Sequence, residues 1–210
     1  HMKQARLDSL ADGIFSIVMT LLVLDFNVPE IAGLATNEGL LQALAGSVPF
    51  FVTFLLSFAL LFTYWRGHHS IVSVLAENID TKLTTMNAFF FILVGLVPFS
   101  TILISRYYET QAAIALYGLH IILLGLLLYQ MREYILSSPT IRNPETTPTQ
   151  LQHMTLRILV PVYTAACAIG LSFFIDTRVS IILFAFAILF NLSGSSTTLF
   201  TKLFPNIFKY

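Results

Sequence analysis

The sequence predicts an all-α membrane protein that crosses the bilayer six times. Apolar residues make up 56% of the chain and charged residues only 10%, whereas a soluble domain carries roughly 25% charged residues. The apolar residues are grouped in runs long enough to cross about 30 Å of hydrocarbon as helices. The basic residues, finally, collect on one side of these runs. We therefore expect a single six-span transmembrane domain over residues 1–210.

Six runs of mostly apolar residues are separated by charged residues or by Pro, Asn and Gly clusters. They cover residues 7–28, 44–66, 83–105, 112–132, 156–175 and 179–200. A kink is expected at Pro98 in the third run, because proline cannot donate a helical hydrogen bond. The connection 133–155 holds several Pro, Ser and Thr residues and is expected to be a hydrated loop.

The placement of Lys and Arg gives an independent test of this topology, because cytoplasmic loops collect basic residues. Six spans place nine basic residues on the N-terminal side and two, Arg106 and Arg178, on the other side. The nine are Lys3, Arg6, Arg66, Lys82, Arg132, Arg142, Arg157, Lys202 and Lys209. Both termini are therefore expected to be cytoplasmic.

Charge and cysteine content exclude several function classes. Eleven basic residues balance eleven acidic ones, so the chain lacks the positive charge on which nucleic-acid binding depends. A single cysteine, Cys167, excludes an intramolecular disulfide and a cysteine-built metal cluster. The adjacent His68 and His69 point about 100° apart on a helix, so they do not readily serve one metal ion.

The first run is unusual because it carries Arg6, Asp8, Asp12 and Asp25. Asp8 and Asp25 fit ordinary positions in the headgroups or at a helix end. Asp12 lies about 9 Å beyond Arg6 along a helix, so it is expected to need a polar partner within the membrane. The same run has a stripe at helical spacing, which by itself fits either ordinary packing or a functional face. The stripe consists of Leu10, Gly13, Ile17, Leu21 and Leu24, with Thr20 beside it.

Residues 5–30, ARLDSLADGIFSIVMTLLVLDFNVPE, resemble the first helix of the transmembrane protein 175 family of endosomal and lysosomal potassium channels. The family motif is Arg, three residues, then Phe-Ser-Asp, with a later Leu-Leu-Val-Leu-Asp run. Arg6, Asp12 and residues 21–25 match it in spacing, whereas Leu10 and Ala11 replace the Phe and Ser. The second run ends in FTYWRGHHSIV and the third reads TTMNAFFFILVGLVPFST, which resemble the Trp-His and Asn-containing helices of the family.

The resemblance implies a homotetramer in which the first helix of each subunit lines a central pore. Ile17 would then face the pore axis as a hydrophobic constriction, followed by Leu21 and Leu24. Thr20 would either contact the ion or bond back to its own helix. Asp25, repeated four times, would form an acidic ring at the outer mouth, unless it is an ordinary helix-end acid.

The resemblance also implies a polar network that fixes the pore helix near the cytoplasmic side. In the family, Arg and Asp of the first helix meet Trp and His of the second and Asn of the third. The corresponding residues here are Arg6, Asp12, Trp65, His68 or His69, and Asn87.

The expected function is passive conduction of cations, preferably potassium, in a prokaryotic plasma membrane. Partners are other copies of the chain, the lipid bilayer and monovalent cations, with no cofactor besides the permeant potassium ion. The alternative is a proton pathway or a secondary cation transporter, although transporters tend to place ionisable groups near the midplane, where the six runs lack Asp, Glu, Lys and Arg. An enzyme is not expected, because no nucleophile with a neighbouring base can be identified.

Overall fold

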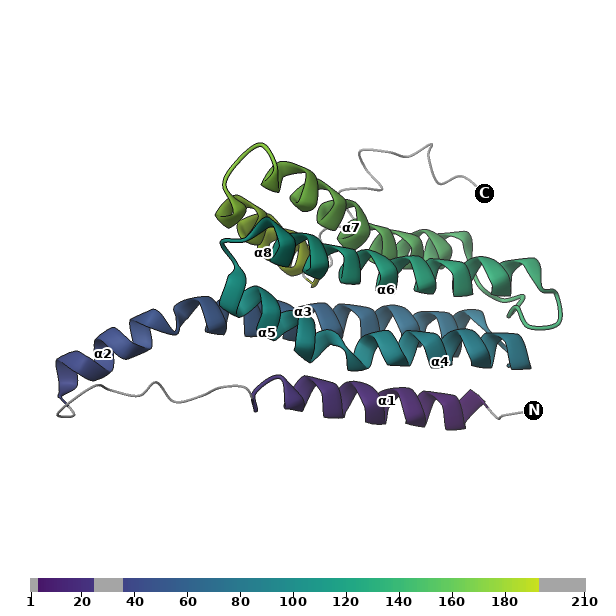
Figure 1. Cartoon of the computed structure of the whole chain (residues 1–210). Helices are drawn as coiled ribbons and strands as arrows, with labels where there is room; N and C mark the ends of the chain where they lie inside the picture. Colours follow the sequence, from purple (N-terminus) through teal and green to yellow (C-terminus); the bar gives the residue numbers. More distant parts are fainter. Residues whose placement is uncertain (1–3, 25–35, 193–210) are drawn as a thin grey trace.

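The computed structural model describes residues 4–24 and 36–192, and these residues form mostly helices. The elements in chain order are α1 (Gln4–Leu21), α2 (Asn37–Gly46), α3 (Val48–His69), the π-helical turn η1 (Ser70–Leu75), α4 (Thr81–Gly95), α5 (Val97–Tyr107), α6 (Gln111–Ser137), α7 (Pro148–Ser172) and α8 (Thr177–Leu192). Most of them are long and run side by side in one bundle (Figure 1).

The bundle places α1 at one edge (Figure 1). This helix packs against α3, η1 and α4, while α6 and α7 pack against each other on the opposite side of the bundle. The short helix α2 extends away from the bundle ahead of α3 (Figure 1). The edge position leaves one side of α1 uncovered within the described chain.

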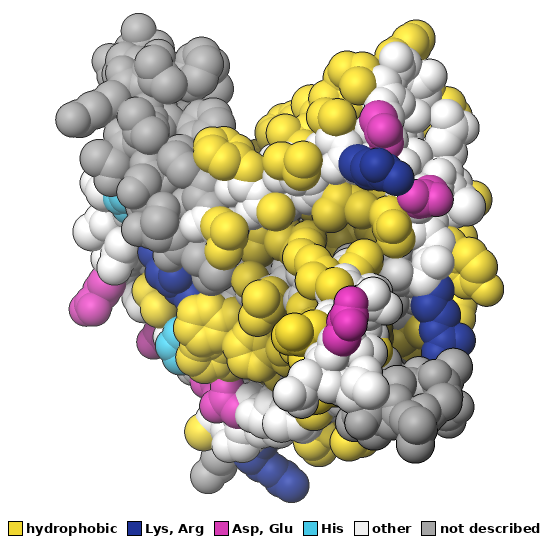
Figure 2. All heavy atoms as spheres, turned by 90° about the vertical axis from the view of Figure 1, so that its left-hand side faces the viewer, with side chains coloured by type: hydrophobic (Ala, Val, Ile, Leu, Met, Phe, Trp, Pro, Cys, Tyr) yellow, Lys and Arg dark blue, Asp and Glu magenta, His cyan; other side chains and the backbone are white. Residues whose placement is uncertain are grey.

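Four helical stretches are long and apolar enough to cross a membrane by length and composition. They are Val48–Leu75, Thr81–Tyr107, Gln111–Ser137 and Pro148–Ser172, and they contain or overlap the second to fifth predicted runs. The described part of α8 is apolar but shorter. Hydrophobic side chains also cover much of the surface at the end of the bundle near α2 (Figure 2). The chain is therefore an all-α membrane protein with several apolar spanning helices.

The helix boundaries differ from the predicted runs, and in two of these differences a proline lies at or next to the boundary. The third run is broken into α4 and α5 at Leu96, since Pro98 occupies the first turn of α5 and cannot bond back into α4. Helix α6 continues past residue 132 to Ser137 and stops just before Pro139. Charged residues end an apolar run but do not end a helix, so the connection to α7 is shorter than predicted.

Two glycines let α6 and α7 approach closely. A Cβ atom on Gly125 would lie 2.2 Å from Cγ2 of Val162 and 3.3 Å from the backbone oxygen of Ile158. A Cβ atom on Gly118 would lie 2.7 Å from side-chain atoms of Ile169. Small residues at membrane helix interfaces allow such backbone approach. The closely packed α6–α7 pair also contacts α3, α4 and α5.

Candidate functional site

Helix α1 has one face that is buried in the bundle. Leu7, Ala11, Phe15 and Val18 are spaced three or four residues apart and are all buried, as one side of an α-helix requires. The ring centroid of Phe15 lies 6.4 Å from that of His68 on α3 and 6.1 Å from that of Phe90 on α4. This face therefore anchors α1 to both neighbouring helices.

The opposite face of α1 is exposed and contains the stripe from the sequence. Ile17 is 59% exposed, Leu21 is 40% exposed and Leu24, just beyond the helix, is 72% exposed. Leu10 and Gly13 are exposed on the same side. No described part of the chain covers these side chains. Asp25 lies outside the described residues.

Thr20 is exposed beside this stripe, and its hydroxyl group bonds to its own helix. Its Oγ1 donates to the backbone oxygens of Ile17, at 2.8 Å, and of Ser16, at 3.0 Å. The hydroxyl hydrogen is used in this way, but the lone pairs of a hydroxyl oxygen can still accept or bind a cation. Of the two roles predicted for Thr20, the structure shows the back-bonding arrangement.

A polar stripe on α1 connects this helix to the end of α3 and to η1. We call Gln4, Asp8 and Asp12 the polar ladder; they are four residues apart and so lie above one another on the helix. Gln4 donates its side-chain amide to the backbone oxygens of Val72, at 2.6 Å, and Ala76, at 3.2 Å. A π-helical turn disturbs the regular hydrogen bonding of a helix, and Gln4 binds carbonyl groups at this turn.

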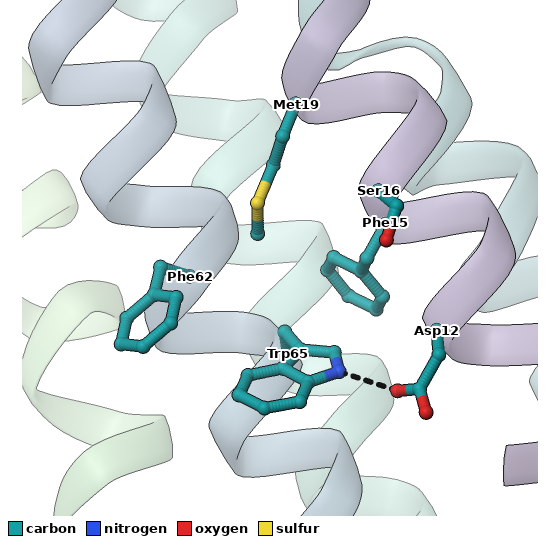
Figure 3. Close-up of a pocket in the computed structure, with 6 residues that line it drawn as sticks. All are labelled: Asp12, Phe15, Ser16, Met19, Phe62 and Trp65. Carbon is teal, nitrogen blue, oxygen red and sulfur yellow. Dashed lines mark hydrogen bonds between the residues drawn. The ribbon is translucent and has the colours of Figure 1, made fainter.

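Asp12 is the rung of the polar ladder nearest the membrane interior. The indole Nε1 of Trp65 donates a 2.7 Å hydrogen bond to its Oδ1 (Figure 3). The two residues lie at the border of a pocket of about 220 Å³ between α1 and α3, which is also lined by Phe15, Ser16, Met19 and Phe62. The carboxylate predicted to need a partner in the membrane thus has an indole donor.

Asp8, the middle rung, accepts a 2.9 Å hydrogen bond from the hydroxyl of Ser73. Nδ1 of His69 lies 3.1 Å from the same hydroxyl oxygen. Because Ser73 has one hydroxyl hydrogen and gives it to Asp8, Nδ1 of His69 is the donor in this second bond. His69 also stacks on Trp65, with ring centroids 6.0 Å apart, so it supports the indole that binds Asp12.

His68 points into the core instead, one position away on α3. Its Nε2 lies 2.6 Å from Oδ1 of Asn87 on α4, and the amide nitrogen of Asn87 donates to the backbone oxygen of Leu83 at 2.8 Å. His68 and Asn87 are both almost fully buried. The His68 ring is stacked on Phe90 with centroids 5.4 Å apart. Since the amide group fixes Oδ1 as the acceptor, His68 carries its proton on Nε2.

Arg6 lies apart from these contacts. It is exposed, and among the described residues no hydrogen bond or ion pair joins it to Trp65, His68, His69 or Asn87. A position two residues after Gln4 is turned by about 200° around the helix, so Arg6 shares the side of Leu10 and Ile17. The predicted network therefore consists of two separate groups, Asp12 with Trp65 and His69, and His68 with Asn87.

The two histidines lie in different environments, as adjacent helical positions require. Within residues 4–24 and 36–192, no three His, Cys, Asp or Glu side chains gather as metal ligands would.

Four polar residues of the structure were not identified as site residues from the sequence. Gln4 and Ser73 gave no signal, because polar residues near a helix end are common, and Asp8 was interpreted as a headgroup residue. His120 gave a signal, since it stands alone in the apolar run 112–132. Its ring nitrogens lie 2.9 Å from the Ser100 hydroxyl and 2.8 Å from the Leu93 oxygen.

Comparison with known proteins finds potassium channels that are similar in sequence to parts of this chain. The sequence profile of the endosomal/lysosomal potassium channel TMEM175 matches residues 6–98, which cover most of α1 and all of α3 and α4. A potassium channel of Chamaesiphon minutus is 36% identical over 111 residues, or 52% of this chain and 54% of that channel. A potassium channel of Streptomyces collinus is 25% identical over 81% of this chain and 83% of that channel.

The fold is similar over almost the whole chain. A crystal structure of a lysosomal potassium-selective channel TMEM175 homolog from Chamaesiphon minutus has a TM-score of 0.72 and 25% sequence identity, and the match covers 91% of this chain and 97% of that one. The match to the first channel named above spans about half of that channel's length. These findings agree with the resemblance seen in the first three runs: residues 6–98 are similar in sequence to the TMEM175 potassium-channel family, and the fold is similar to that of a TMEM175 homolog.

Proposed function

We propose that four copies of this chain form a potassium-preferring cation channel in a bacterial plasma membrane, with α1 of each copy lining a central pore. The observation that carries the proposal is the exposed face of α1, which includes Ile17 and Leu24. The potassium preference is supported by the relatives, which are potassium channels.

The composition of this face supports a partner other than lipid. Besides Leu10 and Ile17 it exposes Ser9, Gly13, Ser16 and Thr20. The exposed side of α6, by contrast, presents leucines, namely Leu116, Leu119, Leu123 and Leu126. Small and hydroxyl-bearing residues favour close packing between membrane helices or contact with a water-filled path. The face of α1 therefore fits an oligomer axis better than the acyl chains of the bilayer.

The proposed gate is a ring of four Ile17 side chains. Apolar side chains that close on an axis remove water from the path and so stop ions. Leu21 and Leu24 follow at four and seven residues, on the same side of the chain. The Thr20 oxygen beside them would offer a polar contact to a passing cation. Asp25 of each copy would form an acidic ring at the outer mouth and raise the local cation concentration.

We propose six membrane crossings with both termini in the cytoplasm. The first and last crossings would include α1 and α8, in addition to the four long apolar stretches. Arg6 on α1 and Lys82 on α4 lie toward the N-terminal end of the bundle, as does Arg142, which is bridged to Ala76 after η1, whereas Arg106 and Arg178 lie on elements at the α2 end. The excess of basic residues at the N-terminal end supports its cytoplasmic location.

A flux assay in liposomes with a potassium gradient tests the function. We expect the wild-type protein to conduct potassium, and Ile17→Asn to conduct faster because it hydrates the ring. The matched control is Ile92→Asn on α4, at a side chain that is 61% exposed; it is expected to leave the flux unchanged. Proton flux without potassium flux, or equal flux in Ile17→Asn and the wild type, would contradict the proposal.

A further inference from the structure

A histidine in the membrane-spanning part of α6 connects the two halves of the broken span α4–α5. Nε2 of His120 lies 2.8 Å from the backbone oxygen of Leu93, in the last turn of α4. Its Nδ1 lies 2.9 Å from Oγ of Ser100, in the first turn of α5. One imidazole ring therefore bridges the break from a third helix.

The break is a place where the backbone has lost a donor. Pro98 has no N–H group, so the helical hydrogen bond to the oxygen of Val94, four residues earlier, cannot form. The Leu93 oxygen accepts a 3.1 Å hydrogen bond from the N–H of Leu96, and His120 is its second partner. Backbone groups at membrane depth need partners from the protein, because hydrocarbon offers none.

The hydrogen positions follow from the partners of the ring. The Leu93 oxygen only accepts, so Nε2 carries a proton. The Ser100 hydroxyl lies within reach of both Nδ1 of His120 and the backbone oxygen of Val97, at 3.0 Å. A neutral ring receives the Ser100 hydrogen at Nδ1, whereas a protonated ring donates to Ser100, whose hydrogen then goes to Val97. Every group of the bridge is bonded in both states.

The surroundings of the bridge are apolar. A groove of about 210 Å³ between α4, α5 and α6 has His120 and Ser100 among its lining residues, and the remaining lining residues are Leu93, Leu96, Phe99, Leu103, Leu116, Leu119 and Leu123. None of these remaining residues is charged or titratable. Water or a charged side chain is therefore poorly placed to replace the bonds of His120.

We propose that His120 is a positioning residue that fastens the α4–α5 break to α6 and thereby fixes α4 against α1. The path is short: α4 carries Asn87 and Phe90, and these contact His68 and Phe15. Phe15 belongs to the buried face of α1, opposite Ile17. This inference rests on the proposed function insofar as α1 is the pore helix.

The test compares two substitutions of His120 in liposomes and in detergent. His120→Leu removes both bonds, whereas His120→Gln keeps an amide N–H for the Leu93 oxygen and an oxygen for Ser100. We expect His120→Leu to lower the folded-to-unfolded ratio about five- to tenfold, the effect of two hydrogen bonds between membrane helices. We also expect it to change potassium flux, and we expect His120→Gln to restore both properties. His153→Leu on α7 is the control for the loss of a histidine.

A spectroscopic measurement separates the bridge from general packing. The ¹⁵N signals of His120, assigned by their loss in His120→Gln, are expected to show a protonated Nε2. Ser100→Ala is expected to shift the Nδ1 signal and leave Nε2 in place. Equal stability and potassium flux of His120→Leu, His120→Gln and the wild type would overturn the inference. An Nδ1 signal that does not shift in Ser100→Ala would also overturn it. If the wild type conducts no potassium, the proposed function fails. The stability and NMR measurements still test whether His120 joins α4 and α5 to α6.

Discussion

Trp65 on α3 donates its indole N–H to the carboxylate of Asp12 on α1 over 2.7 Å, while the other side of α1 exposes Ile17. The bond lies beside the polar ladder contacts of Gln4 and Asp8 with the end of the second span. Together these contacts set the rotation of α1 about its own axis. The contacts of the buried and polar faces of α1 thus determine which side chains of this helix, Ile17 among them, are exposed.

The Asp12–Trp65 bond is expected to act on stability and gating more than on ion preference. Asp12→Ala and Trp65→Phe each remove the bond. The double variant should therefore lose less unfolding free energy than the two single variants lose together. We expect a coupling of about 1 kcal/mol, since hydrogen bonds between membrane helices average about 0.6 kcal/mol and range up to about 1.7 kcal/mol. Thermal unfolding in detergent measures it. An unchanged oligomer with sharply altered selectivity in Asp12→Ala would contradict this role.

The His68–Asn87 pair is expected to show the asymmetry of a buried hydrogen bond. Asn87→Leu leaves the buried N–H of His68 without its acceptor, which costs about 1 to 3 kcal/mol. The double variant Asn87→Leu/His68→Leu removes both polar groups and should be closer to the wild type. Unfolding in denaturant compares the three proteins. Additive losses in the double variant would show that the pair is not coupled.

The close approach of α6 and α7 predicts a difference between two glycine substitutions. Gly125→Ala places its Cβ against Val162 and the backbone oxygen of Ile158, so we expect a loss of about 1 to 3 kcal/mol from overpacking. At Gly170 on α7 nothing lies within 4 Å of a Cβ atom, so Gly170→Ala should be neutral or slightly stabilising. Thermal unfolding of both variants checks the contrast; similar midpoints would rule out a tight contact at Gly125.

Asp80, just before α4, predicts a pH dependence of stability. Burial acts to raise the pKa of its carboxyl, but the bonds from the Tyr134 hydroxyl and the Leu83 N–H, with nearby Lys82, lower that pKa overall. A lowered pKa stabilises the fold above the unfolded value of about 3.9 and loses this contribution as the pH falls through the folded value.

Asp80→Asn isolates the charge, because asparagine caps a helix about as well as aspartate. The wild type should be the more stable protein near neutral pH, and the difference should disappear below the pKa of Asp80. Unfolding midpoints between about pH 2 and pH 7 give the curve. A difference that is constant over this range would mean that the charge of Asp80 contributes nothing.

The sequence predicted the helical membrane fold and the stripe of α1, since both depend on local patterns. The apolar runs located the four long stretches, and the spacing of Leu10, Ile17 and Leu24 predicted one common side of the helix. Asp12 could be predicted to need a partner, because a carboxylate in a span is costly.

The remaining contacts depend on how helices meet, which local patterns do not encode. Gln4 and Ser73 are ordinary polar residues until the end of the second span is placed beside α1. Arg6 was expected by resemblance to join Trp65, a histidine and Asn87, yet its position on the helix places it on the exposed side of α1. His120 could have been found, because a lone histidine in an apolar run needs partners; its function as a bridge depends on the break at Pro98.

Cysteine cross-linking at Ile17 tests the central claim most directly. In a Cys167→Ser background, which removes the exposed native cysteine, Ile17→Cys should form intersubunit disulfides on mild oxidation, because side chains that close on an axis lie within disulfide reach. Leu119→Cys on the leucine-rich side of α6 should not form them, and a thiol reagent should alter potassium flux only through Ile17→Cys. If Ile17→Cys forms no intersubunit disulfide on oxidation and the thiol reagent does not change its potassium flux, α1 does not line a shared pore.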